Sequence, residues 1–151
     1  MVNSELDRQM MRRSIELAAS AASAGNSPVG CVIVLDGRVL AEAQEESPAG
    51  DDPFAHAEIL VVRTALGLMN KQDLSRVTLY STNEPCFLCS YGIREARIGR
   101  IVFAVETPEI GGATSQYPLL KATRINRWGP APQIESGLLA AEYRKALKQR
   151  K

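Results

Sequence analysis

Two segments, Pro53-Phe54-Ala55-His56-Ala57-Glu58 and Glu84-Pro85-Cys86-Phe87-Leu88-Cys89, decide how this sequence is interpreted. Together they supply one imidazole, two thiols and a carboxylate two positions beyond the imidazole: His56, Cys86, Cys89 and Glu58. A catalytic zinc ion needs three protein ligands, an open fourth position for water, and a nearby acid or base that moves a proton of that water. The two segments therefore predict a zinc site in which Glu58 carries protons and is not a ligand.

The spacing of the two cysteines supports metal binding. Cys86 and Cys89 lie three positions apart, so both sulfurs face one side of a helix that is expected to begin at Pro85. The free N–H groups and the dipole of a helix start favour thiolate, the form that binds metal. Alone, a Cys-x-x-Cys pair can be redox-active or merely buried, and a lone histidine is more often structural. Because His56 is the only histidine and a strand separates it from the cysteine pair, the combination favours zinc.

The expected chemistry is hydrolytic deamination. Zinc lowers the pKa of a bound water to about 7, which provides hydroxide at neutral pH. Hydroxide would attack a ring carbon that bears an exocyclic amine, and Glu58 would pass protons to the ring nitrogen and the departing ammonia. The alternative is a structural zinc module, which requires a fourth ligand. Cys31 is the only spare thiol. Its place in an apolar run indicates that it acts as a small buried hydrophobic residue and not as a ligand.

Hydrophobic periodicity and turn signals predict the order of the elements. We expect a helix over 4–24, strands over 30–35 and 38–43, a helix over 55–68, a strand over 77–82, a helix over 85–96, a strand over 100–105, a short helix near 117–122, a brief strand near 133–135 and a last helix from about 138. A hairpin followed by crossover connections implies a mixed sheet with helices on both faces. The expected fold is a single α/β domain over residues 1–151, a three-layer α/β/α sandwich with a five-stranded mixed sheet.

Composition narrows the class of protein. The formal net charge of +1 gives no reason to expect a nucleic-acid partner. No apolar run approaches the roughly 18 residues that span a membrane, so no membrane partner is expected. The three cysteines do not suggest a disulfide framework. Acids within the first 16 residues argue against a transit peptide, so the expected location is the cytoplasm.

The sequence resembles the cytidine/deoxycytidylate deaminase superfamily, most closely the branch of tRNA adenosine deaminases and guanine-type base deaminases. The matching segments run in order through most of the chain: Pro28-Val29-Gly30, Asp52-Pro53, Ala55-His56-Ala57-Glu58-Ile59, Thr78-Leu79-Tyr80, Glu84-Pro85-Cys86, Cys89, Arg97-Ile98 and Val102-Phe103. The resemblance implies the sandwich fold, Zn²⁺ ligation by His56, Cys86 and Cys89, proton shuttling by Glu58, and a homodimer.

Departures from that branch suggest the substrate. Glu45 stands where the tRNA enzymes have an asparagine that holds the target base, and an ionised carboxylate cannot donate hydrogen bonds. Glu46, Asp51 and Asp52 would repel phosphates, and Thr107-Pro108-Glu109 lacks a cation of the tRNA enzymes. The leading expectation is a deaminase of a small free nucleobase or nucleoside, guanine-, cytosine- or adenine-like. The alternative is a tRNA-specific adenosine deaminase.

Several further residues are candidates for substrate binding. Glu45, Phe54, Asn83 and Trp128 are the expected contacts, with Phe54 as a wall or stacking ring and Trp128 as an aromatic lid. The C-terminal stretch with Arg144, Lys145, Lys148, Arg150 and Lys151 is basic. A solvated helix end explains it, although contact with RNA phosphates is the alternative.

Overall fold

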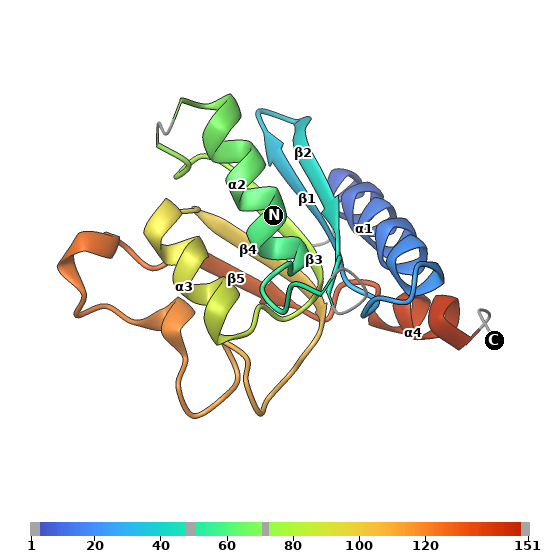
Figure 1. The fold of residues 1–151 in the computed structure, drawn as a ribbon. Helices are drawn as coiled ribbons and strands as arrows, with labels where there is room; N and C mark the ends of the chain where they lie inside the picture. The colour runs from blue at the N-terminus through green and yellow to red at the C-terminus, as the bar shows by residue number, and fades with distance from the viewer. Residues whose placement is uncertain (1–3, 48–50, 71–72, 149–151) are drawn as a thin grey trace.

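The computed structural model describes residues 4–47, 51–70 and 73–148, and Figure 1 shows their arrangement. The elements in chain order are α1 (Glu5–Ser23), β1 (Gly30–Leu35), β2 (Arg38–Gln44), α2 (Ala57–Leu68), β3 (Thr78–Asn83), α3 (Phe87–Ala96), β4 (Arg100–Val105), the short 3₁₀ helices η1 (Leu119–Lys121) and η2 (Asn126–Trp128), β5 (Gln133–Ser136) and α4 (Ala140–Lys148). No helix in these ranges is both long and apolar enough to cross a membrane.

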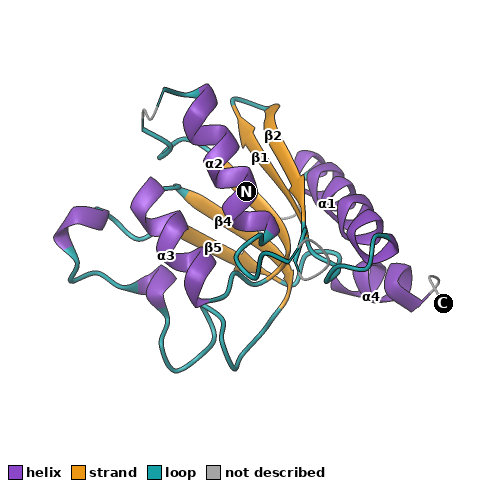
Figure 2. Ribbon diagram, in the orientation of Figure 1, coloured by secondary structure: helices purple, strands orange, loops and turns teal. Residues whose placement is uncertain are grey.

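The five strands form one mixed sheet in the order β2-β1-β3-β4-β5. Strand β1 pairs antiparallel with β2 and β3, while β3, β4 and β5 run parallel. Helices α2 and α3 cover one face of the sheet, and α1 and α4 cover the other (Figures 1 and 2). The predicted three-layer α/β/α sandwich is therefore confirmed.

Side chains that alternate between the two faces of the buried strands form two apolar cores, one on each face of the sheet. Cys31 and Ile33 of β1 face the core under α2 and α3, whereas Val32 and Val34 face the core under α1. Because neighbouring residues of a strand point to opposite faces, a strand covered on both sides reads as a continuous apolar run. The burial of β1 on both faces bears out the prediction made from that run.

Local sequence signals set the ends of the helices that surround the site. His56 and Cys86 both have extended backbone and act as N-caps of α2 and α3. Pro85 thus precedes the cap and is not the first helical residue, which corrects the predicted helix start by two positions. The predicted elements do not include η2, a single turn in a Gly- and Pro-rich region.

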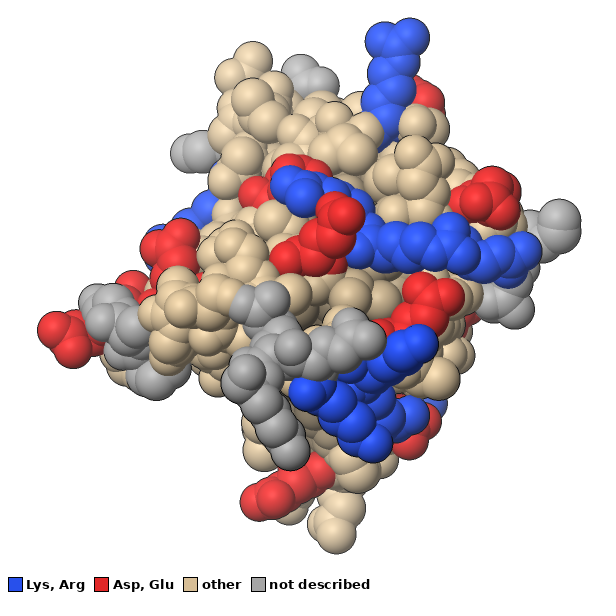
Figure 3. Space-filling view, turned by 90° about the vertical axis from the view of Figure 1, so that its right-hand side faces the viewer, with Lys and Arg blue, Asp and Glu red and all other residues tan. Residues whose placement is uncertain are grey.

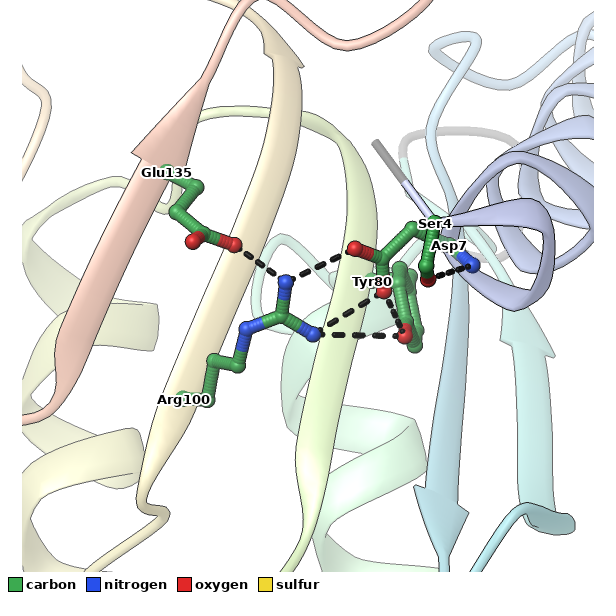
Figure 4. Close-up of polar contacts among 5 residues, drawn as sticks. All are labelled: Ser4, Asp7, Tyr80, Arg100 and Glu135. Atoms are coloured by element: carbon green, nitrogen blue, oxygen red, sulfur yellow. Dashed lines mark hydrogen bonds and ion pairs between the residues drawn. The ribbon is translucent and has the colours of Figure 1, made fainter. Parts of the chain in front are cut away.

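A polar cluster ties the sheet to α1 beside the apolar core, as Figure 4 shows. Arg100, at the start of β4, donates to both carboxylate oxygens of Asp7 at 2.9 and 2.8 Å and also pairs with Glu135 of β5. The hydroxyl of Tyr80 donates to Asp7 at 2.5 Å. Although burial opposes the charge, the hydrogen bonds from Arg100 and Tyr80 lower the pKa of Asp7 to about 2. This cluster lies at the amino end of β4, whereas the two cysteines follow the carboxyl end of β3.

Candidate active site

The three predicted metal ligands converge at the starts of α2 and α3. The Nδ1 atom of His56 lies 3.3 Å from Sγ of Cys89 and 3.5 Å from Sγ of Cys86, and the two sulfurs are 3.7 Å apart. Among the described residues, these three form the one group of His, Cys, Asp or Glu side chains close enough to share an ion. Cys31 does not belong to that group, so the fourth ligand that a structural zinc module requires is not supplied by the spare thiol.

The spacing of these atoms fits a tetrahedral zinc ion. Zn–S bonds of about 2.3 Å and Zn–N bonds of about 2.0 Å in a tetrahedron place two sulfurs about 3.8 Å apart and nitrogen about 3.5 Å from sulfur. The distances between the ligand atoms match these values within a few tenths of an ångström. The side chains are therefore arranged for zinc, with the fourth position left for water or substrate.

The electrostatics of the helix start favour a thiolate. The pKa of Cys86 is lowered to about 5, chiefly by a hydrogen bond with the Cys89 thiol and further by the backbone of Cys89 and by His56. Burial raises the pKa of Cys31 well above its ordinary value, so that thiol stays protonated. The hydrogen bond with Cys86 and burial raise the pKa of Cys89, so without metal the two sulfurs share one proton, which zinc binding would release.

Glu58 occupies the first turn of α2, and its side chain is buried beside the ligands. Burial is the main cause that raises its pKa to about 8, and the neighbouring Glu45 and Cys86 act in the same direction. A bound zinc cation would oppose this shift, because a positive charge stabilises the carboxylate. A carboxyl group whose proton is held near neutral pH is suited to accept and return protons.

Glu84 fixes the loop that follows β4 against the cysteine turn. Its buried carboxylate accepts hydrogen bonds from the backbone N–H groups of Thr107, Ala113 and Thr114 at 2.9, 2.8 and 2.7 Å, and from the Thr114 hydroxyl at 2.6 Å. Burial opposes the charge, but these four donors hold the pKa of Glu84 below its ordinary value. Gly111 of the same loop forms an isolated β-bridge with Cys86. The loop is thus held directly against a metal ligand.

Glu45 lies at the site, as the sequence predicted, but it also has a local structural role. Its side chain is buried, and Oε1 accepts the backbone N–H of Ala57 at 2.7 Å. That bond fixes the turn that carries His56 and Glu58. Burial raises the pKa of Glu45, while the Ala57 N–H and the charge of His56 oppose that shift.

Asn83 ends β3 directly before Glu84, with its side-chain oxygen engaged by two hydroxyls. Thr82 donates to Oδ1 at 2.7 Å, and the hydroxyl of Tyr143 lies 3.0 Å from the same atom. The Tyr143 hydroxyl also donates to the carbonyl of Pro28 at 2.6 Å. These contacts connect α4 to the strand end at the site.

The two aromatic candidates, Phe54 and Trp128, differ in their exposure and in their partners. Phe54 is 64% exposed and borders an apolar groove between α2 and α3, together with Leu88 and Tyr91. Trp128 is buried on the outer side of α3, where its indole N–H donates to Glu95 at 2.7 Å and its ring packs under the Arg94 guanidinium. The structure therefore places Glu45 against the turn of His56 and Asn83 at the strand end that leads to Cys86. Phe54 lies exposed two positions before His56, and Trp128 is buried against α3.

Two residues of the site environment, Glu84 and Tyr143, were absent from the predicted set. The partners of Glu84 lie 23 to 30 positions later in an irregular loop, and Asn83 lies 60 positions before Tyr143. A glutamate directly after a buried strand is the only sequence signal that could have indicated Glu84.

Comparison with known proteins agrees with this geometry. Residues 4–105 match the cytidine and deoxycytidylate deaminase zinc-binding region. The tRNA-specific adenosine deaminase of Haemophilus influenzae is 37% identical over 142 residues, which cover 93% of this chain and 80% of that protein. A chain solved in a study of A-to-I editing by tRNA deaminases at the wobble position superposes with a TM-score of 0.82 and 33% identity, covering 91% of this chain and 98% of that one. The guanine deaminase of Bacillus subtilis has a TM-score of 0.61 and 35% identity, covering 65% of this chain and 63% of that one.

The fold and the site define a zinc-dependent deaminase, a hydrolase of carbon–nitrogen bonds in cyclic amidines. The chain belongs to the cytidine and deoxycytidylate deaminase family. His56, Cys86 and Cys89 are positioned to bind the zinc ion of that family. When bound, zinc supplies hydroxide at neutral pH by lowering the pKa of water.

The comparisons overturn the leading expectation for the substrate. The relatives that match nearly the whole chain are tRNA-specific adenosine deaminases, so the expectation of a free base or nucleoside was wrong. The structure explains why the acidic loop misled that inference. Glu45 is buried on the N–H of Ala57, and Asp52 accepts the N–H of Phe54 at 2.9 Å. Of the four acids, only Glu45 is buried, and its carboxylate holds the turn that carries the metal ligand, whereas Asp52 keeps its exposed charge.

Proposed function

We propose that this protein is a tRNA-specific adenosine deaminase that converts adenosine to inosine in an unpaired anticodon loop. The observation that carries the substrate assignment is the similarity to tRNA-specific adenosine deaminases over nearly the whole chain. The spacing of His56, Cys86 and Cys89 beside a buried Glu58 supports the deaminase chemistry. The net reaction adds one water to adenosine and releases inosine and one ammonia.

Glu58 carries the protons of this reaction in our proposal. It accepts a proton from the attacking water and delivers it to the ring nitrogen next to the reacting carbon. The second proton leaves with the amino group, which departs as ammonia after the carbon–nitrogen bond breaks. The Glu58 carboxyl is buried, so it lies in an environment of low dielectric. The metal ligands hold fixed positions there and guide the proton transfers.

We propose different roles for the four candidate substrate residues. Asn83 donates from its amide nitrogen, because its oxygen is already engaged by Thr82 and Tyr143. Glu45 lines the base pocket and fixes the turn of His56. Phe54 forms an exposed wall at the entrance. Trp128 affects the substrate only indirectly, because its buried ring holds the chain segment on the outer side of α3.

We also infer that the protein forms a homodimer. A groove of about 470 Å³ between α2 and α3 supports this inference, and its walls are mainly apolar: Ile59, Val62, Leu66, Leu88 and Tyr91. Tyr91 and Leu88 are exposed in the single chain, and apolar surface of this kind is covered in stable dimers. Light scattering of the zinc-loaded protein should give twice the chain mass, and Leu88→Glu should shift the protein toward the single chain.

The proposal is tested with an RNA stem-loop that carries a single adenosine at the wobble position. The zinc-loaded protein should convert that adenosine to inosine, detected as a mass change after nuclease digestion, and release one ammonia per inosine. Guanine, adenine, cytosine and their nucleosides serve as the comparison panel. Release of ammonia from a member of the panel, with an unchanged stem-loop, would overturn the proposal.

A further inference from the structure

The segment 115–128, between β4 and β5, carries an unbalanced positive charge. Between Glu109 and Glu135 the sequence contains three bases and no acid: Lys121, Arg124 and Arg127. All three side chains are exposed. We call this segment the basic excursion, and in Figure 1 it passes along the outer side of α3 in orange.

The basic excursion is attached firmly to the active site. Leu120 donates its backbone N–H to Gly112 at 2.9 Å, and Gly112 donates its own to Pro85 at 2.8 Å, next to the ligand Cys86. Arg94 of α3 is buried and donates to the carbonyls of Leu119 and Ala122, at 2.8 Å each. A charged surface held at a fixed position relative to a catalytic centre can position a long substrate as well as attract it.

Two of the three bases are available to a ligand. Arg127 pairs with Glu95. Across residues 4–47, 51–70 and 73–148, neither Lys121 nor Arg124 takes part in an ion pair or a side-chain hydrogen bond. Exposed bases without acid partners contribute directly to the binding of phosphates.

An exposed aromatic ring of the basic excursion contacts the residue that follows a metal ligand. Tyr117 is 65% exposed, and its ring contacts the ring of Phe87 edge-on at a centroid distance of 6.0 Å. Phe87 directly follows Cys86 in the sequence. Aromatic rings that leave one face open to solvent provide stacking surfaces for unpaired bases.

The other charged surfaces of the molecule carry acids among their bases. Figure 3 looks onto the side that carries α1 and α4, where blue and red side chains are interspersed. Two bases of α1 are paired there with acids: Arg12 with Glu5 and Glu142, and Arg13 with Glu16 and Glu42. The exposed α4 bases Arg144, Lys145 and Lys148 have no ion pair within the described residues, but they share this side with the acids that Figure 3 shows. On the other rim of the active site, Glu46, Asp51 and Asp52 are exposed acids. Charge therefore favours an RNA path across the basic excursion and away from the loop before α2.

We infer that the basic excursion is the surface that binds the RNA backbone next to the target adenosine. Tyr117 stacks on a neighbouring unpaired base, and Lys121 and Arg124 neutralise phosphates of the same strand. This inference rests on the proposed function, because it assigns the RNA substrate to a path from the zinc site across the basic excursion.

The test compares two double variants that remove the same charge. Lys121→Gln with Arg124→Gln neutralises the basic excursion. Arg38→Gln with Arg76→Gln is the matched control, since both residues are exposed and lie beside the β1–β2 hairpin turn at the opposite end of the sheet (Figure 1). Binding of a fluorescent anticodon stem-loop is measured over a range of salt concentrations with Glu58→Gln as the common background. Thermal melting of each protein verifies that it is folded.

Neutralising the basic excursion should weaken RNA binding about tenfold near physiological salt, whereas the control pair stays close to the parent. It should also lower the slope of log affinity against log salt by about 1.4, since each phosphate of a single strand contributes about 0.7. Tyr117→Ser should weaken binding about tenfold, and Tyr117→Phe should restore it. Equal affinities and equal salt slopes for the two double variants would overturn the inference.

The binding assay also separates this inference from the proposed function. A wild-type protein that deaminates the stem-loop while both double variants bind it equally refutes the basic excursion alone. A wild-type protein that leaves the adenosine unchanged refutes the proposed function. In that case, RNA binding that still depends on Lys121 and Arg124 supports the basic excursion as an RNA-binding surface. RNA binding that does not depend on these two residues refutes that role.

Discussion

Glu84 and Gly111 are packed so closely that a Cβ atom at position 111 would lie 2.0 Å from the Oε2 atom of Glu84. The loop that follows β4 surrounds the Glu84 carboxylate with four hydrogen-bond donors. Gly111 of the same loop forms a β-bridge with Cys86. A buried carboxylate in the interior thus sets the position of a zinc ligand through the backbone of a loop.

Glu84→Gln should loosen this loop and weaken zinc retention. The amide cannot accept hydrogen bonds from every direction as a carboxylate does, so at least one backbone N–H loses its acceptor. The expected loss is about 2–4 kcal/mol of unfolding free energy, measured by chemical denaturation of the zinc-loaded protein. Zinc transfer to a chelator should be faster than in the wild type. Glu109→Gln, at an exposed acid of the same loop, is the control. Unchanged zinc transfer in Glu84→Gln would contradict this role.

Glu58→Gln should abolish turnover and leave zinc bound. The substitution keeps the size of the side chain but removes the group that accepts a proton, so we expect a loss of about 10²- to 10⁴-fold or more in kcat. Zinc content by elemental analysis should equal that of the wild type. Glu46→Gln removes an exposed acid near the same site and should retain activity. Substantial activity in Glu58→Gln would mean that another group carries the proton.

Cys86 should be the most reactive thiol of the metal-free protein. Its pKa of about 5 leaves it as thiolate at pH 6.5, where an ordinary cysteine is almost entirely protonated. Alkylation with iodoacetamide at that pH, followed by peptide mass mapping, should modify Cys86 rapidly and leave Cys31 unmodified. Addition of zinc should suppress the reaction. Labelling of Cys31 at the rate of Cys86 would contradict the assigned environments.

Arg100→Met should destabilise the protein through Asp7. Removing one partner of a buried pair costs about 3–5 kcal/mol, because the other charge stays buried without its counter-ion. Arg76→Met removes the exposed pair with Asp36 and should cost less than about 1 kcal/mol. Urea denaturation at pH 7 measures both, and similar costs for the two variants would contradict the structural role of the cluster in Figure 4.

The same cluster should impose a defined pH dependence. The pKa of Asp7 is about 2 in the folded protein and about 3.9 in an unfolded chain, so the ionised group stabilises the fold above about pH 4. That stabilisation is lost as the pH falls from about 4 to 2. In Arg100→Met the burial of Asp7 raises its pKa, so the difference from the wild type should narrow as the pH is lowered from 7 to 4. A difference that stays constant over this range would assign the effect to packing alone.

The fold and the metal site could be predicted because their signals are local. The alternation and length of the apolar runs define the strands, and the spacing of Cys86 and Cys89 follows from the geometry of one helix turn. His56 and Glu58 occupy the start of a second helix, so their placement also depends on nearby sequence. Each of these features involves residues within a few positions of one another.

The remaining features depend on contacts between distant segments. Glu45 was predicted to face the substrate, but its bond to Ala57 depends on how the loop folds back on α2. Trp128 was predicted to be an aromatic lid, and in the structure its ring is buried against Arg94 and Glu95 of α3, residues of a distant segment. The substrate was inferred from single departures such as Glu45, whereas the similarity over the whole chain points to tRNA.

The most direct test of the proposed function is a competition between RNA and free bases in one reaction. The zinc-loaded protein is incubated with an anticodon stem-loop carrying a wobble adenosine, together with an excess of adenine, guanine and cytosine, and every product is quantified by mass spectrometry. We predict inosine in the stem-loop, ammonia in equal amount, and unchanged free bases. Deamination of a free base with the stem-loop adenosine intact would contradict the assignment of tRNA as the substrate.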